Sequence, residues 1–232
     1  WGWGLPALHG WAVRAGLYAQ MGLALVLLHR LLPFFAANAI PAYRGRSGAR
    51  FLPVLAGGVV LRLGLAALPG AVAEAAGGVL DLVIAAWILQ EAWRWSPSTA
   101  MGRWLVGAKL VPVAWIGLGL LLSAAHAWGW AWPDAGRAWI HALGVGGVSG
   151  MILAFSTRVS LGHGGRPLQP DRWLRVAFWL LQAAAVLRLA LPAWTWAVSG
   201  GMIAGTHWAA WPWIVAFALW LLRLMPLMGR HS

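Results

Sequence analysis

An apolar stretch without a single charge, residues 139–155, constrains the fold of this chain more than any other feature. It is long enough for one membrane-spanning helix, and Gly146 and Gly150 stand four residues apart, the spacing of a helix-packing face. His141 lies near its beginning, and a basic, glycine-rich segment with His163 follows it. An unbroken helix would hold these two histidines ~33 Å apart, at about 1.5 Å per residue. We therefore expect one histidine near each membrane surface and no metal ion bound by both.

The composition places the whole chain in a lipid bilayer. Of its 232 residues, 61% are hydrophobic and 9% are charged, and its mean hydropathy is +0.73, whereas soluble domains carry about 25% charged residues. Lipid admits only helices and closed barrels, and these apolar segments are too long for barrel strands. The sequence predicts an all-α, polytopic transmembrane helix bundle of about seven spans in a single membrane domain, residues 1–232. Pro33 is expected to break the segment after the first span, and Pro192 to begin a turn. The predicted spans are residues 11–28, 51–68, 71–93, 104–127, 138–157, 176–191 and 200–222.

The charges predict the orientation of these spans. The 17 Lys and Arg residues against 5 Asp and Glu residues give a formal net charge of +12, and the basic residues gather in alternate connections. The positive-inside rule and the anionic lipids of the cytoplasmic leaflet account for this pattern better than nucleic-acid binding does. We expect the N-terminus outside, the C-terminus in the cytoplasm, and a tryptophan belt at the outer surface. Because the chain starts at Trp1 without a methionine, we interpret it as a fragment or a processed chain.

Two motifs give the chain a resemblance to a known family. The matching residues are HAL at 141–143, VG at 145–146, MIL at 151–153, TRVSLGH at 157–163 and GRP at 165–167, with PFF at 33–35 and NA at 38–39. They resemble the C-terminal half of the NnrS family, polytopic bacterial membrane proteins linked to nitric oxide and nitrosative stress and reported to carry haem and copper. The resemblance implies an inner-membrane protein that binds haem and/or copper. It also implies a partner, either another membrane chain or the family's N-terminal half, which has no counterpart here.

The predicted topology sorts the histidines into an outer and an inner group. Imidazole nitrogen is a ligand for haem iron and for copper, so His126, His141 and His207 are candidate metal ligands at the outer surface. Hydrogen bonding to headgroups or water is the favoured alternative for His126 and His207. For His141, the family resemblance favours a role as a ligand.

The inner end of the same motif is a candidate anion site. His163 lies among glycines and between Arg158 and Arg166, and these arginines are able to hold haem propionates or a phosphate. A loop that only contacts lipid headgroups is the alternative.

Charges inside the spans predict an ion pair, because a lone charge in lipid is costly. Arg62 precedes the turn at Pro69-Gly70, and Glu74 and Asp81 follow it, so we expect Arg62 to pair with Asp81 or Glu74. The pair either fixes helix register or forms part of a proton or ion path. Arg188, in the sixth span, has no partner that the sequence reveals.

The sequence excludes some chemistry and leaves three functions open. There is no cysteine, no HExxH motif, no Walker-type spacing and no recognisable Ser-His-acid arrangement. The first function is a haem- and/or copper-associated protein of nitric oxide, nitrosative-stress or denitrification physiology. The second is a cofactor-free subunit of a larger, respiratory membrane complex, and the third is a small-solute transporter built around Arg62, Asp81 and Arg188.

Overall fold

Helices are the only regular secondary structure in the part of the chain that the computed structural model describes, residues 5–40, 43, 47–95, 104–130, 135–166, 169–199 and 206–228. The elements are α1 (Leu5–Ala39), α2 (Phe51–Ala67), α3 (Ala71–Trp95), α5 (Trp104–Gly107), α6 (Leu110–Ala127), α7 (Ala135–His141), the π-helix η1 (Ala142–Ser149), α8 (Gly150–His163), α9 (Arg172–Ser199), the 3-10 helix η2 (Thr206–Ala209) and α10 (Ala210–Met228). The predicted all-α polytopic bundle is thereby confirmed. Six helical segments are long and apolar enough to cross a bilayer, and α2, with 17 residues, is a shorter apolar helix at the lower limit for a span.

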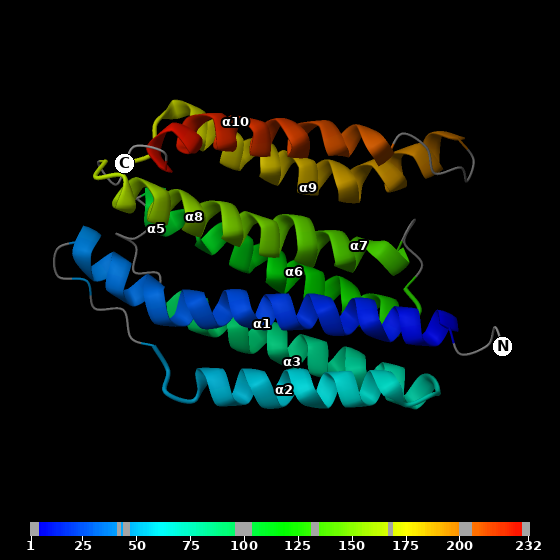
Figure 1. Ribbon diagram of the computed structural model, residues 1–232. Helices are drawn as coiled ribbons and strands as arrows, with labels where there is room; N and C mark the ends of the chain where they lie inside the picture. The colour runs from blue at the N-terminus through cyan, green and yellow to red at the C-terminus, as the bar shows by residue number, and fades with distance from the viewer. Residues whose placement is uncertain are drawn as a thin grey trace.

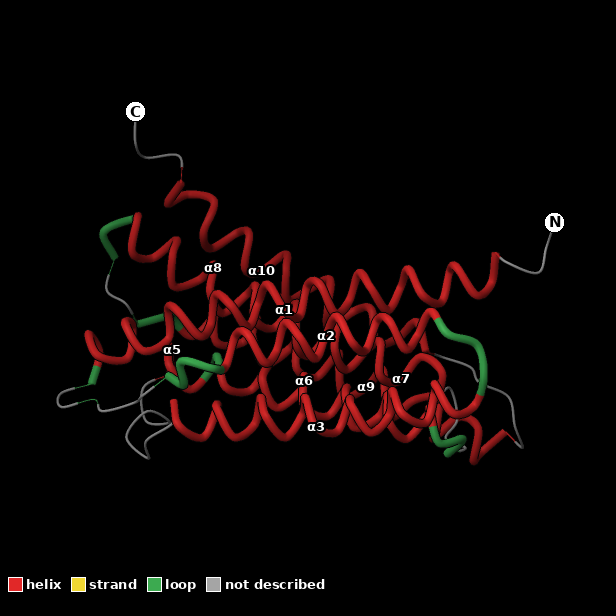
Figure 2. The backbone as a smooth tube through the Cα atoms, turned by 90° about the horizontal axis from the view of Figure 1, so that it is seen from below, coloured by secondary structure: helices red, strands yellow, loops and turns green. Residues whose placement is uncertain are grey.

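The helices run roughly along one axis in stacked layers (Figures 1 and 2). The α9–α10 pair forms one outer layer, α2 and α3 lie at the opposite side, and α1, α6 and the α7–η1–α8 helix fill the centre (Figure 1). Helix α1 begins at one end of the bundle and α10 ends at the other (Figure 1). The start of the last predicted span, residues 200–205, lies outside the described residues.

Two expectations about prolines are wrong. Helix α1 continues through Pro33, and α9 continues through Pro192 as far as Ser199, where a turn was expected. Proline removes one backbone donor, but membrane helices tolerate this where side chains and neighbouring helices satisfy the freed groups.

One face of α1 supplies much of the largest core cluster. Its fully buried side chains follow helical spacing, at Tyr18, Met21, Leu25, Leu28, Leu32 and Ala36. They pack with buried residues of α3, α6 and the α7–η1–α8 helix. Large apolar side chains on the outside, such as Leu23, Val83 and Leu222, are exposed, as expected for surfaces that face lipid.

The charge-free stretch of residues 139–155 lies in the central helix of the bundle, formed by α7, η1 and α8. In the most apolar 18-residue stretch of the segment Arg137–His163, 67% of the residues are buried. In the corresponding stretch of the segment that contains α10, only 17% are buried. The middle of the central helix is the eight-residue π-helix η1, held against α6 by glycines. A Cβ at Gly147 would lie 2.8 Å from Cγ1 of Ile116, and one at Gly146 would run into the ring of Trp115. Close approach to α6 therefore requires small residues in this segment.

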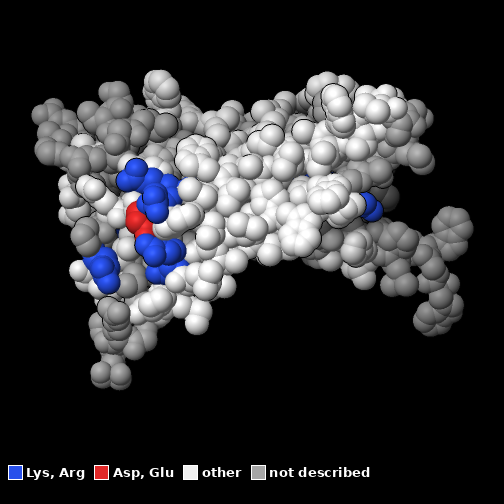
Figure 3. All heavy atoms as spheres, turned by 90° about the horizontal axis from the view of Figure 1, so that it is seen from above, with Lys and Arg blue, Asp and Glu red and all other residues white. Residues whose placement is uncertain are grey.

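Basic side chains gather at the end of the bundle where α8 and α9 meet and α10 ends (Figure 3). Arg172, Arg175 and Arg223 lie there with Asp171, and Nε of Arg223 donates to Oδ2 of Asp171 at 2.9 Å. The positive-inside rule predicts that this end faces the cytoplasm. We call it the inner end below, and the opposite end the outer end.

Candidate functional site

An open pocket of about 340 Å³ lies at the outer half of the bundle, between the central helix and the α9–α10 layer. Its lining residues are His141, Val145, Ala184, Arg188, His207, Ala209, Ala210 and Trp213. They come from α7, η1, α9, η2 and α10, so the pocket depends on five elements that are distant in the sequence. Ala184 and Arg188 stand one turn apart on α9 and therefore share a face.

His141 is held in place by an arginine on another helix. Nε of Arg188 donates a hydrogen bond to Nε2 of His141 at 3.0 Å, and both side chains are partly buried. Because Nε2 accepts this bond, a neutral His141 carries its proton on Nδ1. His141 is also the last residue before η1, and π-helical segments are frequent at functional sites.

The structure brings together two of the three candidate outer histidines. His207 lines the same pocket as His141, and its exposed ring lies 5.3 Å from that of Trp208. His126 lies elsewhere, at the end of α6, where it lines a smaller apolar pocket of about 150 Å³ with Trp130 and Leu189. Among residues 5–40, 43, 47–95, 104–130, 135–166, 169–199 and 206–228, no three His, Asp or Glu side chains gather closely enough to hold one metal ion.

The charges within the spans form a second buried cluster. Nε of Arg62 donates to Oδ1 of Asp81 at 3.0 Å, both side chains are 0% exposed, and Nη2 of Arg62 lies 4.0 Å from the half-exposed Glu74. The hydroxyls of Tyr18 and Ser123 also donate to Asp81, the second at 2.7 Å. The cluster thus connects α1, α2, α3 and α6 around one carboxylate.

The cluster of Arg62 and Asp81 continues toward the central helix. Nη1 of Arg14 donates to the hydroxyl of Ser123 at 3.4 Å, and its guanidinium lies 5.0 Å from the ring of Trp139, two residues before His141. Nη1 and Nη2 of Arg62 are buried without a hydrogen-bond partner in the described part of the chain. Space for this guanidinium comes from Gly77, where a Cβ would lie 2.6 Å from Nη1.

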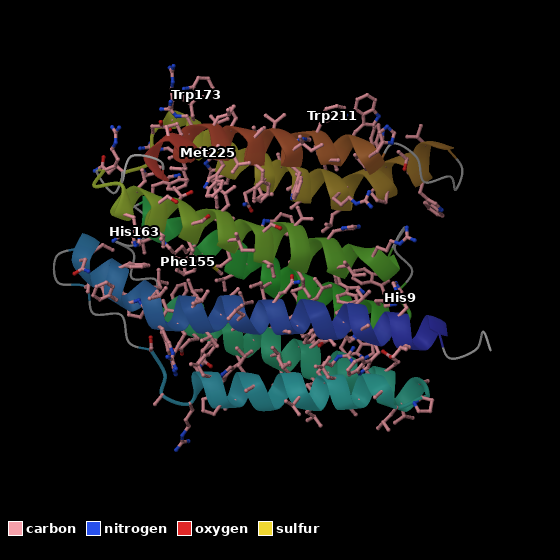
Figure 4. All side chains as sticks on the ribbon, viewed as in Figure 1. His9, Phe155, His163, Trp173, Trp211 and Met225 are labelled. Atoms are coloured by element: carbon pink, nitrogen blue, oxygen red, sulfur yellow. The ribbon has the colours of Figure 1, made fainter. Side chains whose placement is uncertain are left out.

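The candidate residues of the inner end take different positions. His163 is exposed at the end of α8, and its Nδ1 lies 3.0 Å from the carbonyl oxygen of Val159 in the same helix (Figure 4). Arg166 is exposed in the turn after α8, where Gly165 has a φ of 61°. Arg158 points into the bundle, with its guanidinium 4.6 Å from the ring of Phe35 on α1.

The family model described as "NnrS protein" matches residues 1–231. The chain belongs to the NnrS family. The match covers almost the entire chain and is not confined to the two motifs from which the resemblance was drawn. No curated protein and no solved structure matches the chain.

The two motifs of this NnrS chain meet in space. Phe35, from the PFF motif, contacts Phe155 at 6.5 Å between ring centroids and Arg158 at 4.6 Å, and both partners belong to or adjoin the TRVSLGH motif. In Figure 4, Phe155 lies between the ribbons of α8 and α1. The second motif, weak on its own in sequence, is therefore a packing partner of the first.

Sequence reasoning missed several polar residues of this NnrS chain. Lys109 is fully buried beside Phe35 and Phe155, although it was assigned to a predicted span. Glu91 is buried and accepts a hydrogen bond from Arg94 at 3.2 Å, and His29 lies 3.8 Å from it. Each carried an available signal, since charged residues within spans are rare and usually functional or paired.

Proposed function

We propose that this chain is a haem- and/or copper-associated protein of the bacterial inner membrane, acting in nitric oxide or nitrosative-stress physiology. Membership of the NnrS family supports this functional class. The pocket at the outer end is where we propose that the haem or copper binds. The observation that carries the proposal is that His141 and His207, which belong to different elements, line one pocket.

The pocket offers side chains of the chemical types that bind haem iron or copper. Two imidazoles offer nitrogen ligands of the type that haem iron and copper both accept. Arg188 adds a cation able to pair with a carboxylate of the cofactor or with another anion, and Val145 and Trp213 supply an apolar wall. Ligation through Nε2 of His141 requires Arg188 to release the hydrogen bond that it now donates to that atom.

The residues of the pocket have separable tasks in this proposal. Arg188 fixes the tautomer and direction of the free His141 ring, and it competes with a metal for Nε2. His207 adds the second imidazole from the short helix η2, and the apolar wall packs against the bound group. A bound metal would supply a centre that binds nitric oxide or exchanges one electron.

Absorption spectra of the purified protein test the proposal. The wild type is expected to show a haem band or, without haem, a stoichiometric copper content, and His141→Ala and His207→Ala are expected to lose it. His9→Ala is the matched control, because His9 is an exposed histidine near the outer end that lines neither pocket (Figure 4). A wild type without iron and copper, or variants that keep the full content, would contradict the proposal.

One observation favours a second function, the transport of a small polar solute. The buried Nη atoms of Arg62 lack a hydrogen-bond partner in the described part of the chain, and Glu74 connects the cluster to the surface. In that case Arg62→Leu abolishes solute flux into proteoliposomes while the metal content stays unchanged. Arg137→Leu, a change of an exposed arginine at the outer end, is the control.

A further inference from the structure

The face of α1 that points away from the bundle carries a polar side chain at the middle of the span. Gln20 is exposed and makes no hydrogen bond in the described part of the chain. In the helix it stands halfway between Trp11 and His29. Nε1 of Trp11 donates to the carbonyl of Leu63 near the outer end of α2, at 3.1 Å. His29 stacks on Phe51, the first residue of α2 at the inner end, so Gln20 lies about midway between the two surfaces.

An exposed amide at this depth has no water to bind. The hydrocarbon core of a bilayer is about 30 Å thick, so its middle lies ~15 Å from either surface, and a glutamine side chain is too short to reach the headgroups. A polar group without a partner in hydrocarbon costs free energy, and polar side chains inside membranes accordingly join helices by hydrogen bonds. The amide of Gln20 therefore requires a partner that the described part of the chain does not supply.

The residues around Gln20 form a packing stripe on the same face. The stripe consists of Gly16, Gln20, Leu23 and Leu27, which follow one another at intervals of four, three and four residues, and we call it the α1 stripe. This is the spacing of helices that pack together as a left-handed pair. All four residues are exposed, Leu23 by 64% and Leu27 by 42%, and a Cβ at Gly16 would meet no atom within 4 Å. The stripe ends before Arg30, whose exposed charge lies at the inner end, at the level of the headgroups.

We propose that the α1 stripe is a dimer interface that packs against the same stripe of a second copy of this chain. Two copies with the same orientation in the membrane are related by a two-fold axis along the membrane normal, so their Gln20 side chains meet at one depth. An amide carries donors and an acceptor, and the pair therefore forms two hydrogen bonds, each Nε2 donating to the Oε1 of the other copy. A different membrane chain would need its own polar group at that depth, whereas a second copy supplies one by symmetry. Gly16 permits close approach, and one polar position in such a stripe fixes the register.

Sedimentation equilibrium of the full chain in density-matched, neutral micelles tests the interface. The wild type is expected to show an equilibrium between monomer and dimer. Gln20→Leu is expected to raise the dissociation constant about threefold to thirtyfold, the range for the loss of hydrogen bonds between membrane helices. Gln20→Asn keeps the amide and is expected to stay closer to the wild type. Val83→Leu changes an exposed side chain on α3 and is the control, expected to associate as the wild type does.

Single cysteines locate the interface, because the chain has no cysteine of its own. Leu23→Cys places a thiol on the α1 stripe, one turn from Gln20, and is expected to give a disulfide-linked dimer when proteoliposomes are oxidised. Val83→Cys, at a side chain that is 57% exposed on α3, is expected to remain monomeric. Iodine serves as the oxidant, since copper is a candidate ligand of the pocket at the outer end.

Both measurements proceed without added metal, so their outcome does not depend on the proposed function. A wild type that stays monomeric at every concentration would overturn the dimer and leave the amide of Gln20 to a different membrane chain. The proposal is equally wrong if Gln20→Leu associates as tightly as Val83→Leu. Disulfide formation that is as rapid in Val83→Cys as in Leu23→Cys would show that α1 is not the interface.

Discussion

Nε of Arg188 donates a hydrogen bond to Nε2 of His141 at 3.0 Å, and this bond joins α9 to the residue that precedes the π-helix. Arg188→Leu removes the donor and leaves the His141 ring without its fixed direction. We expect this variant to keep the metal stoichiometry of the pocket and to bind copper at least several-fold more tightly, because Nε2 of His141 no longer has to lose a hydrogen bond before it binds the metal. Copper titration checks this, with Arg137→Leu as control. An identical copper affinity in both variants would show that Arg188 does not act on the metal site.

The buried pair of Arg62 and Asp81 predicts a large loss of stability when one charge is removed. Arg62→Leu leaves Asp81 buried with one donor fewer, which we expect to cost about 3–5 kcal/mol in the free energy of unfolding. The double variant with Asp81→Leu should recover part of that loss, since no uncompensated charge remains. Glu74→Gln should cost less than about 1 kcal/mol, because this carboxylate is 43% exposed and lies 4.0 Å away. Denaturant unfolding in mixed micelles measures all three variants. Equal losses of unfolding free energy in Arg62→Leu and Glu74→Gln would contradict this prediction.

Two glycines of the π-helix offer a matched test of its packing. Gly146→Ala drives a methyl group into the ring of Trp115, and we expect a loss of about 1–3 kcal/mol in stability. Gly144→Ala meets only Cδ2 of Leu17 at 3.5 Å, an ordinary contact, and should be neutral or slightly stabilising. Thermal unfolding compares the two variants. A larger loss of stability in Gly144→Ala than in Gly146→Ala would contradict this prediction.

Asp171 predicts a dependence of stability on pH at the inner end. Burial acts to raise the pKa of Asp171, but hydrogen bonds from Arg223 and from the amides of Leu174 and Trp173 hold the pKa below its ordinary value of 3.8. A carboxyl with a lower pKa in the folded state stabilises the protein above its ordinary pKa and loses that contribution as the pH falls through the folded pKa. We therefore expect the unfolding temperature to drop below about pH 4.

The variant Asp171→Asn isolates that contribution, because it keeps the shape of the side chain and cannot ionise. Its unfolding temperature should lie below that of the wild type at neutral pH, and the two should converge as the pH is lowered. Two curves that stay parallel from neutral to acid pH would show that the link between Asp171 and Arg223 contributes nothing to the acid response.

Hydropathy and charge were enough to predict the bundle, because lipid leaves helices as the main solution for long apolar segments. The prolines were misjudged for a physical reason. Pro33 and Pro192 break helices in water, but each lies within a continuous helix here, which helices in a membrane protein tolerate. The π-helix was equally hidden, since no residue pattern in 142–149 distinguishes its register from that of an α-helix.

The candidate site was only partly accessible from the sequence. His141 was found through its motif, but its partner Arg188 stands 47 residues away, and only the packing of α9 against the central helix reveals the bond. In the sequence, His126 and His207 were equivalent candidates for metal ligands. In the structure they line different pockets, because α6 ends beside the smaller one. Lys109 could have been noticed as a lone lysine inside an apolar segment.

Electron paramagnetic resonance of the purified, oxidised protein tests the central claim most directly, because coupling to imidazole nitrogen identifies histidine ligands of copper or haem iron. The account predicts a metal signal with imidazole coupling that is lost in His141→Ala and retained in His9→Ala. A metal signal that is unchanged in His141→Ala, or a wild type with no bound metal at all, would contradict it.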